Sequence, residues 1–325
     1  MVANPLFSQV ERPRMAKTST LLLIGLVAFA YISALAIVDS QKTFLVALAD
    51  IASVMPPLLA TSLAAYALRA LRWSLLLAVF GHRLAFRQVV VSYVAGFAFT
   101  ASPGKVGELL RIRYFGWHGA PASHVVAAFV FERMLDLVVL LLFASVLAGS
   151  TRGFGLAALF VAILLSVIVV TARSPRLRYR LQHLFRTLHL RLLARIVRVV
   201  LKGVEQTLVF LPARHLIPVT LLTCIAWGTQ CIGYALTLSG LGIDQPAWVL
   251  FAVPPSAILI GAASLLPGGI GTTEAATVML LDHFGVALDI AVLAAITLRL
   301  GSIWFATLLG LAAAFWLEIV PRKPA

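Results

Sequence analysis

Seven ionisable residues lie in or beside long apolar stretches of this 325-residue chain. They are Lys105, Glu108, Glu132, Arg133, Asp136, Glu274 and Arg299. At the centre of a lone helix in a bilayer, each of these side chains would cost about 2.5–3.5 kcal/mol. They must therefore face the interior of a helix bundle, where they form ion pairs or contact water.

The basic members of this set suit an anionic ligand. Arg133, Arg299 and Lys105 can compensate the charge of a head group, while the carboxylates balance charge, orient the arginines or carry protons. The alternative is structural and pairs Arg133 with Glu108 and Arg299 with Glu274. We expect the ligand role for the arginines, and both roles stay open for the two glutamates. Either glutamate can also lie in the first turn of a helix and complement its dipole.

Two breaks in the apolar sequence accompany these charges. The first reads Ser102-Pro-Gly-Lys-Val-Gly-Glu108, and the second reads Leu266-Pro-Gly-Gly-Ile-Gly-Thr-Thr-Glu274. An arginine, Arg133 or Arg299, follows each glutamate after 25 residues. The shared motif and the equal spacing predict an internal repeat.

Broken helices at membrane depth point to a binding site. They leave unpaired amide groups, which are tolerated only where protein or a water-filled cavity covers them. Two half-helix N-termini that meet there would suit phosphate. Glycines at the breaks allow tight turns and close approach of a ligand, although they can also serve only helix packing. The predicted substrate-binding residues are Lys105, Glu108, Arg133, Asp136, Glu274 and Arg299 with Gly104, Gly107, Gly268, Gly269 and Gly271.

The composition identifies the class of protein that must hold these residues. Apolar and aromatic residues make up 61% of the chain and charged residues 12%, against about 45–50% and about 25% in soluble domains. An ordinary soluble enzyme, a disordered chain and a secreted disulfide scaffold are excluded. We expect an all-α polytopic membrane protein.

The apolar runs predict about six full transmembrane helices. They cover residues 21–38, 47–68, 134–149, 153–172, 215–240 and 298–319. The first run resembles a signal peptide at Ala34-Leu35-Ala36, but its long polar lead and the later spans favour an uncleaved helix.

A basic linker divides the single integral membrane domain, residues 1–325. Between Arg173 and Lys202 the chain has nine Lys and Arg residues and no acid. The linker, 173–213, is predicted to form one cytoplasmic amphipathic helix on anionic lipid. It separates a first half, 18–172, from a second half, 214–320. Because no aromatic stacking surface interleaves the charge, we expect no nucleic-acid partner.

A cytoplasmic linker fixes the sides on which the other segments lie. Residues 88–110 must begin and end on the cytoplasmic side, and residues 247–284 must begin and end outside. Each segment is predicted to be a re-entrant helical hairpin, and their opposite orientation indicates an inverted repeat, which is typical of transporters.

The basic residues follow the same scheme. Of the 26 Lys and Arg residues, Lys42 and Arg152 face outward, Lys105, Arg133 and Arg299 lie in the membrane, and 21 are cytoplasmic. The cytoplasmic group includes Arg69, Arg72 and Arg111. Both termini are therefore expected in the cytoplasm.

No sequence motif for covalent chemistry is present. The chain lacks a Walker motif, a Gly-x-Ser-x-Gly elbow, a Cys-x-x-Cys pair and a His-Glu-x-x-His pattern. We expect no catalytic residue, no metal and no cofactor.

Four segments together resemble the lysylphosphatidylglycerol synthase transmembrane-region family, which is also called flippase-like. They are Leu71-Arg72-Trp73, Pro103 to Glu108 with Arg111, Glu132-Arg133-Met-Leu-Asp136, and Pro267 to Glu274. The resemblance covers about residues 18–320 and implies lipid translocation between leaflets. The family includes the membrane half of the bacterial multiple peptide resistance factor, which adds a soluble aminoacyl-transferase domain. This chain ends at Ala325, so the transferase activity is not expected here.

The leading hypothesis is a flippase of the bacterial inner membrane. It would move an anionic or phosphate-bearing lipid, such as a phospholipid or a polyprenyl-phosphate-linked sugar, and its partners would be membrane lipids. One alternative is a membrane transferase acting on a lipid-linked sugar, with Glu108, Asp136 or Glu274 as base. Another is a non-transporting scaffold of an envelope-lipid synthesis complex. A second copy of the chain and envelope-synthesis enzymes stay open as protein partners.

Overall fold

The computed structural model describes residues 44–147, 153–187 and 191–319. The predicted first span, 21–38, lies outside the described residues, as do Lys42 and Arg152. The chain divides into two compact units, 1–50 and 51–325.

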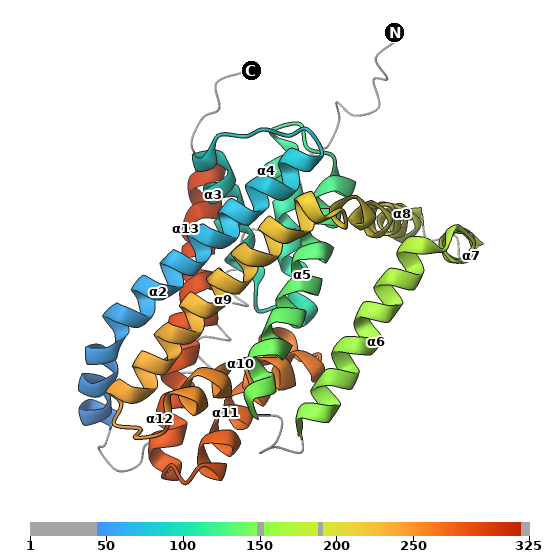
Figure 1. The fold of residues 1–325 in the computed structure, drawn as a ribbon. Coiled ribbons are helices and arrows are strands. Elements are labelled where there is room, and N and C mark those ends of the chain that lie inside the picture. Colours follow the sequence, from blue (N-terminus) through green and yellow to red (C-terminus); the bar gives the residue numbers. More distant parts are fainter. Residues whose placement is uncertain (1–43, 148–152, 188–190, 320–325) are drawn as a thin grey trace. The chain divides into compact units, whose positions relative to one another are not determined.

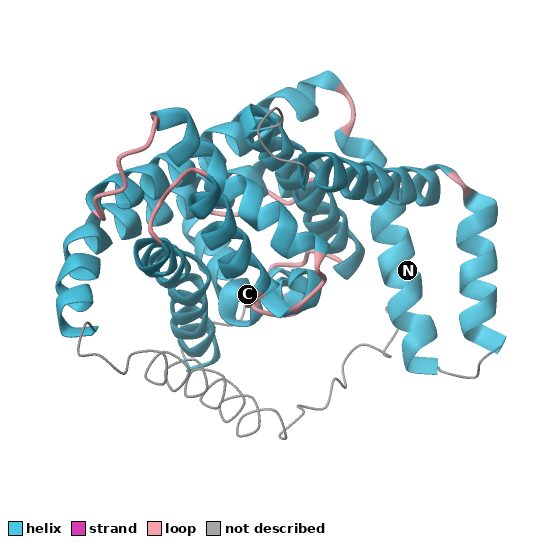
Figure 2. Ribbon diagram, turned by 90° about the horizontal axis from the view of Figure 1, so that it is seen from below, coloured by secondary structure: helices cyan, strands magenta, loops and turns pink. Residues whose placement is uncertain are grey.

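The described residues are almost entirely helical, and none of them forms a strand (Figure 2). Four helical stretches are long and apolar enough to cross a membrane: Ile51–Val79, Gly155–Arg173, Ala213–Gly240 and Leu288–Ile319. They belong to α2 (Phe44–Val79), α6 (Gly153–Arg173), α9 (Ala213–Gly240) and the continuous run from α12 to α13 (Figure 1). The all-helical fold of a multi-pass membrane protein is confirmed.

The first half contains shorter helices around the first break. They are α3 (Phe86–Ala95), the 3-10 turns η2 (Gly96–Phe99) and η3 (Pro103–Leu110), α4 (Arg111–Gly116), α5 (Ala122–Ala144) and η4 (Ser145–Leu147). The second half contains α10 (Ala247–Ala263), η6 (Pro267–Gly269), α11 (Thr272–His283), α12 (Leu288–Arg299), the π-helical η7 (Leu300–Trp304) and α13 (Phe305–Ile319). Proline stands immediately before α5, α9 and α10, where its missing N–H and fixed φ favour a helix start.

Two predicted spans are longer in the structure. The span predicted for 47–68 continues to Val79 because the apolar residues Leu75, Leu76 and Leu77 follow its arginines. The last span begins at Leu288 rather than at residue 298, so Arg299 lies in the middle of a helix.

The predicted single linker helix was wrong. Its residues form α7 (Pro175–Thr187) and α8 (Arg191–Gln206), which pack against each other. Pro175 starts a new helix directly after α6, and the Ser174 hydroxyl accepts the Leu177 N–H at 3.2 Å. Arg178 holds this corner, because it donates to the Thr171 carbonyl at 3.0 Å and pairs with Glu205 of α8 at 2.5 Å.

Three apolar cores stabilise the described helices, and the two larger ones are built as follows. One contains the fully buried Trp73, Tyr93 and Phe115, and joins α2, α3, α4 and α5. The other joins α2, α9, α10, α11 and α12 around Leu58 and Leu281. The elements that carry the two chain breaks, η3 and η6, contact each other.

Candidate ligand-binding site

The two chain breaks adopt the same local structure. Gly104 and Lys105 have φ of 57°, and Gly268 and Gly269 have φ of 60° and 63°. In each turn the N–H of the third residue donates to the carbonyl that precedes proline, from Lys105 to Ser102 and from Gly269 to Leu266, both at 2.9 Å. The shared Pro-Gly motif thus corresponds to a shared left-handed turn.

The two turns also touch each other. The Gly268 N–H donates to the Ser102 carbonyl at 3.4 Å. A Cβ on Gly268 would come within 3.1 Å of the Ala101 Cα, so the close approach depends on glycine. Glu274 lies in the first turn of α11, as one of the sequence-based alternatives expects. Glu108 instead lies within η3, ahead of α4.

A cavity of about 560 Å³ opens beside the contact between the turns. Its polar side includes Ser102 and Lys105 of the first break and Gly268 of the second. Other lining residues are apolar and include Phe160 and Leu164 of α6. The volume lies in the range of about 300–1,000 Å³ that is typical of small-molecule sites.

Most of the predicted substrate-binding residues line this cavity. Those at its wall are Gly104, Lys105, Arg133, Asp136, Gly268, Gly269 and Arg299. The other four, Gly107, Glu108, Gly271 and Glu274, belong to the same turns or the helices that follow them.

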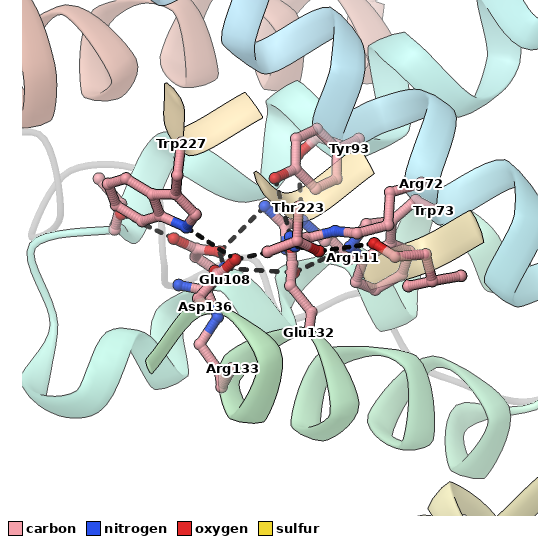
Figure 3. Close-up of polar contacts among 12 residues, drawn as sticks. Arg72, Trp73, Tyr93, Glu108, Arg111, Glu132, Arg133, Asp136, Thr223 and Trp227 are labelled. Carbon is pink, nitrogen blue, oxygen red and sulfur yellow. Dashed lines mark hydrogen bonds and ion pairs between the residues drawn. The ribbon is translucent and has the colours of Figure 1, made fainter. Parts of the chain in front are cut away.

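Figure 3 shows a buried cluster of charges, two of whose members, Arg133 and Asp136, line the cavity. It comprises Arg72, Glu108, Arg111, Glu132, Arg133 and Asp136, and we call it the buried cluster. Glu132 is its centre, because it pairs with Arg72, with Arg111 at 3.1 Å and with Arg133 at 3.3 Å.

Neutral donors complete the shell of Glu132. The Trp73 indole N–H donates to it at 2.8 Å and the Tyr93 hydroxyl at 3.0 Å. Glu132 is fully buried, so its charge depends on these donors and on the arginines.

Two further carboxylates extend the buried cluster. Asp136 pairs with Arg72 at 2.8 Å and with Arg133 at 2.9 Å, and it accepts the Trp227 indole N–H at 3.0 Å. Glu108 pairs with Arg111 at 2.9 Å. Three arginines thus face three carboxylates, and the buried cluster carries no net charge.

The predicted arginines both have carboxylate partners. Arg299 Nε donates to Glu274 Oε1 at 2.9 Å, and its Nη2 donates to the Gly268 carbonyl at 2.8 Å. Arg133 lies 4.0 Å from Glu108, but 2.9 Å from Asp136. The expected Arg133–Glu108 pair is therefore the longer of these two contacts.

Three arginines are buried, which the sequence did not predict. Arg69, Arg72 and Arg111 were counted with the cytoplasmic charges, but they are 8%, 0% and 0% exposed. For Arg69 and Arg72 a signal was present, because six residues from Leu75 to Phe80 without charge follow them and extend the apolar run. Arg111 gave no such signal, since it stands beside the exposed Arg113.

The site holds no recognisable metal-ligand set. Within the described ranges, no three His, Cys, Asp or Glu side chains come together in a group that could hold a metal ion. The arrangement can therefore be interpreted through its charges and its shape.

Fold and site define a helical multi-pass membrane protein whose chain breaks meet beside a charged, partly apolar cavity. The chain belongs to the family described as lysylphosphatidylglycerol synthase TM region, which matches residues 15–310. The segments that carry the resemblance in sequence, around Arg72, Glu108 and Glu132, form the buried cluster. Searches of curated proteins and of solved structures each gave no match.

Proposed function

We propose that this protein is a flippase that moves an anionic or phosphate-bearing lipid between the leaflets of a membrane. One observation carries the proposal: a single cavity joins charged side chains at two chain breaks to an apolar wall. Arg133, Arg299 and Lys105 line its polar part, and Phe160, Leu164 and Ile168 of α6 line its apolar part. A lipid has the same division, with a charged head group and apolar tails.

We further propose that the segments 88–110 and 247–284 are oppositely oriented re-entrant hairpins of an inverted repeat. The matching turns at Gly104 and Gly268 support this assignment. So does their placement, because α3 and α4 lie near one end of the bundle in Figure 1 and α11 and α12 lie near the other. Opposed movements of the two repeats would give alternating access to the cavity.

The proposed orientation places the basic end of the bundle in the cytoplasm of a bacterial cell, with the protein in the inner membrane. Exposed arginines mark that end: Arg83, Arg87, Arg113, Arg176, Arg180, Arg195, Arg198 and Arg214. Among the described residues, the connection between α9 and α10 and the helix ends on either side of the α11–α12 turn carry Asp244, Asp282 and Asp289 and no Lys or Arg. This asymmetry agrees with the positive-inside rule.

In this proposal the protein performs no covalent step. The carboxylates that could act as a base, Glu108, Asp136 and Glu274, are all paired with arginine. The paired carboxylates favour charge compensation over proton abstraction. Transferase and scaffold roles remain the competing hypotheses for the experiment.

Reconstitution into liposomes with fluorescent phospholipids tests the proposal. We expect a dithionite-accessible fraction that grows faster with the protein than in empty liposomes, and slower transport by Arg133→Ala and Arg299→Ala. Arg83→Ala is the matched control, because Arg83 is exposed and does not line the cavity. The proposal is wrong if no candidate lipid moves faster with the protein and both cavity variants behave as wild type in cells.

A further inference from the structure

Basic residues around the cavity outnumber the carboxylates that pair with them. The three arginines of the buried cluster face its three carboxylates, and Arg299 faces Glu274. Two basic residues at the cavity wall are left over, namely Arg69 and Lys105. Within the described part of the chain, neither lies within ion-pair distance of a carboxylate.

Arg69 is buried without the partners that a buried guanidinium needs. Its side chain belongs to a residue only 8% exposed, and its Nε and Nη2 atoms are buried with no hydrogen-bond partner. The guanidinium stacks on aromatic rings instead, with its Cζ 4.3 Å from the Trp227 ring centre and 5.9 Å from that of Tyr66. Stacking fixes the plane of the guanidinium and leaves Nε and Nη2 without acceptors.

Lys105 lies at the tip of the first break in an unfavourable backbone conformation. Its φ of 57° is in the left-handed region, where the matching position of the second break has Gly269. A lysine at a position that favours glycine is a strained choice, and such strain clusters at functional sites. The turn holds Lys105 against the cavity, to which Gly104 and Ser102 also contribute.

We propose that Arg69 and Lys105 together bind a lipid head group that carries two negative charges on phosphate, such as a phosphomonoester or a diphosphate. This inference rests on the proposed function and deepens it. Two uncompensated positive charges match a dianion, whereas a phosphodiester brings one negative charge and a zwitterion brings none. Arginine can bind phosphate oxygens with two parallel N–H groups, and lysine adds a compact charge.

Binding to the purified protein in detergent tests the assignment. The probes are dioctanoyl phosphatidic acid, phosphatidylglycerol and phosphatidylcholine at pH 8, where a phosphomonoester is close to doubly charged because its second pKa is about 6. We expect phosphatidic acid to bind about tenfold more tightly than phosphatidylglycerol, and phosphatidylcholine to bind least.

Three variants separate a ligand contact from a structural one. Arg69→Gln and Lys105→Gly should each weaken the binding of phosphatidic acid by about tenfold. The melting temperature without ligand should be unchanged or higher, because each variant removes an unpaired charge. Glycine also suits the φ of Lys105. Arg83→Gln is the control and should bind as wild type. Unchanged binding by both cavity variants overturns the inference, as does equal binding of phosphatidic acid and phosphatidylglycerol.

Two further arms identify the source of the phosphate and the step that fails. If inorganic phosphate alone binds as tightly as phosphatidic acid, the lipid assignment is overturned. If phosphatidic acid binds as expected but crosses liposomes no faster with the protein, the flippase proposal is wrong and the binding inference stands. If lipids cross faster without preference for the phosphomonoester, the flippase proposal stands and this inference is wrong.

Discussion

The amide of Gly268 donates to the carbonyl of Ser102 at 3.4 Å, and this bond joins the two chain breaks. Each break leaves its helix with unpaired backbone groups, which an apolar environment would penalise. Here one break supplies a donor and the other an acceptor. The contact therefore satisfies part of the polar backbone of both breaks at the wall of the cavity.

Substitution of Gly268 should disrupt this contact. Gly268→Ala places a Cβ in the left-handed region, which costs about 1–2 kcal/mol, and brings it to 3.1 Å from the Ala101 Cα and 2.6 Å from the Ile303 Cδ1. We expect a larger loss of thermal stability in detergent than backbone strain alone produces. Lipid transport should fall as well.

Gly285→Ala is the matched control for this substitution. Gly285 has φ of 81°, but nothing lies within 4 Å of its added Cβ. The Gly285→Ala variant should therefore lose only the stability that backbone strain removes, about 1–2 kcal/mol. Equal melting temperatures for the two variants would show that the turns do not need to touch.

Removal of Arg72 should be among the most destabilising changes in the chain. Arg72→Met leaves the buried Glu132 and Asp136 without one of their counter-charges. Breaking a buried ion pair from one side costs about 3–5 kcal/mol. Thermal unfolding in detergent and the yield of folded protein in membranes measure the effect.

Arg113→Met provides the comparison for Arg72. Arg113 pairs with Glu318 at 2.8 Å, but its side chain is 48% exposed. Exposed pairs contribute about 0–1 kcal/mol, so this variant should unfold close to wild type. If Arg72→Met unfolded at the same temperature as wild type, the buried cluster would not stabilise the fold.

The two predicted arginine–glutamate pairs should differ in strength. Arg299 and Glu274 are 2.9 Å apart, whereas Arg133 and Glu108 are 4.0 Å apart and both have nearer partners. Double-mutant cycles with Gln substitutions should give a coupling of about 0.5–3 kcal/mol for Arg299–Glu274 and less for the other pair. A stronger Arg133–Glu108 coupling would contradict the geometry.

Cysteine labelling can test the two re-entrant hairpins. After replacement of Cys224 and Cys231, single cysteines at Arg83 and Gly116 lie near the two ends of the first hairpin, and single cysteines at Asp244 and Asp282 lie near the two ends of the second. All four positions are exposed. A membrane-impermeant maleimide should reach the first two only from the cytoplasm.

The second pair should react from outside in intact cells. Labelling of Arg83→Cys and Gly116→Cys from opposite sides would make the first segment a full span and exclude the hairpin. The same outcome for Asp244→Cys and Asp282→Cys would exclude the second hairpin. Either result would also remove the inverted repeat.

The sequence predicted features that depend on local order. Pro103-Gly104 and Pro267-Gly268 indicated turns because proline and glycine restrict or permit particular φ values, and the turns are present. The apolar runs similarly predicted the helices, since burial in a membrane needs length and composition. These properties can be derived from neighbours along the chain.

Ion-pair partners that are distant in the sequence could not be predicted from neighbouring residues along the chain. Arg72 was taken for a cytoplasmic anchor because its counter-charges, Glu132 and Asp136, come from another helix. The unpaired state of Arg69 is even less accessible to sequence, because it follows from where all the carboxylates lie. The Arg299–Glu274 pair was among the sequence-based alternatives, whereas the contributions of Arg72 and Arg111 to the buried cluster required the fold.

If the proposed flippase activity holds, the position of α6 has a consequence for the tails of the lipid. Only 11% of its most apolar stretch is buried, less than in the three other candidate spans, and α6 lies at the edge of the bundle (Figure 1). On this side, the single helix α6 therefore separates the cavity from the hydrocarbon of the bilayer. Extracting a tail would cost about 0.8 kcal/mol per methylene, whereas tails that pass beside α6 never leave the bilayer. Translocation would then have to desolvate the head group alone.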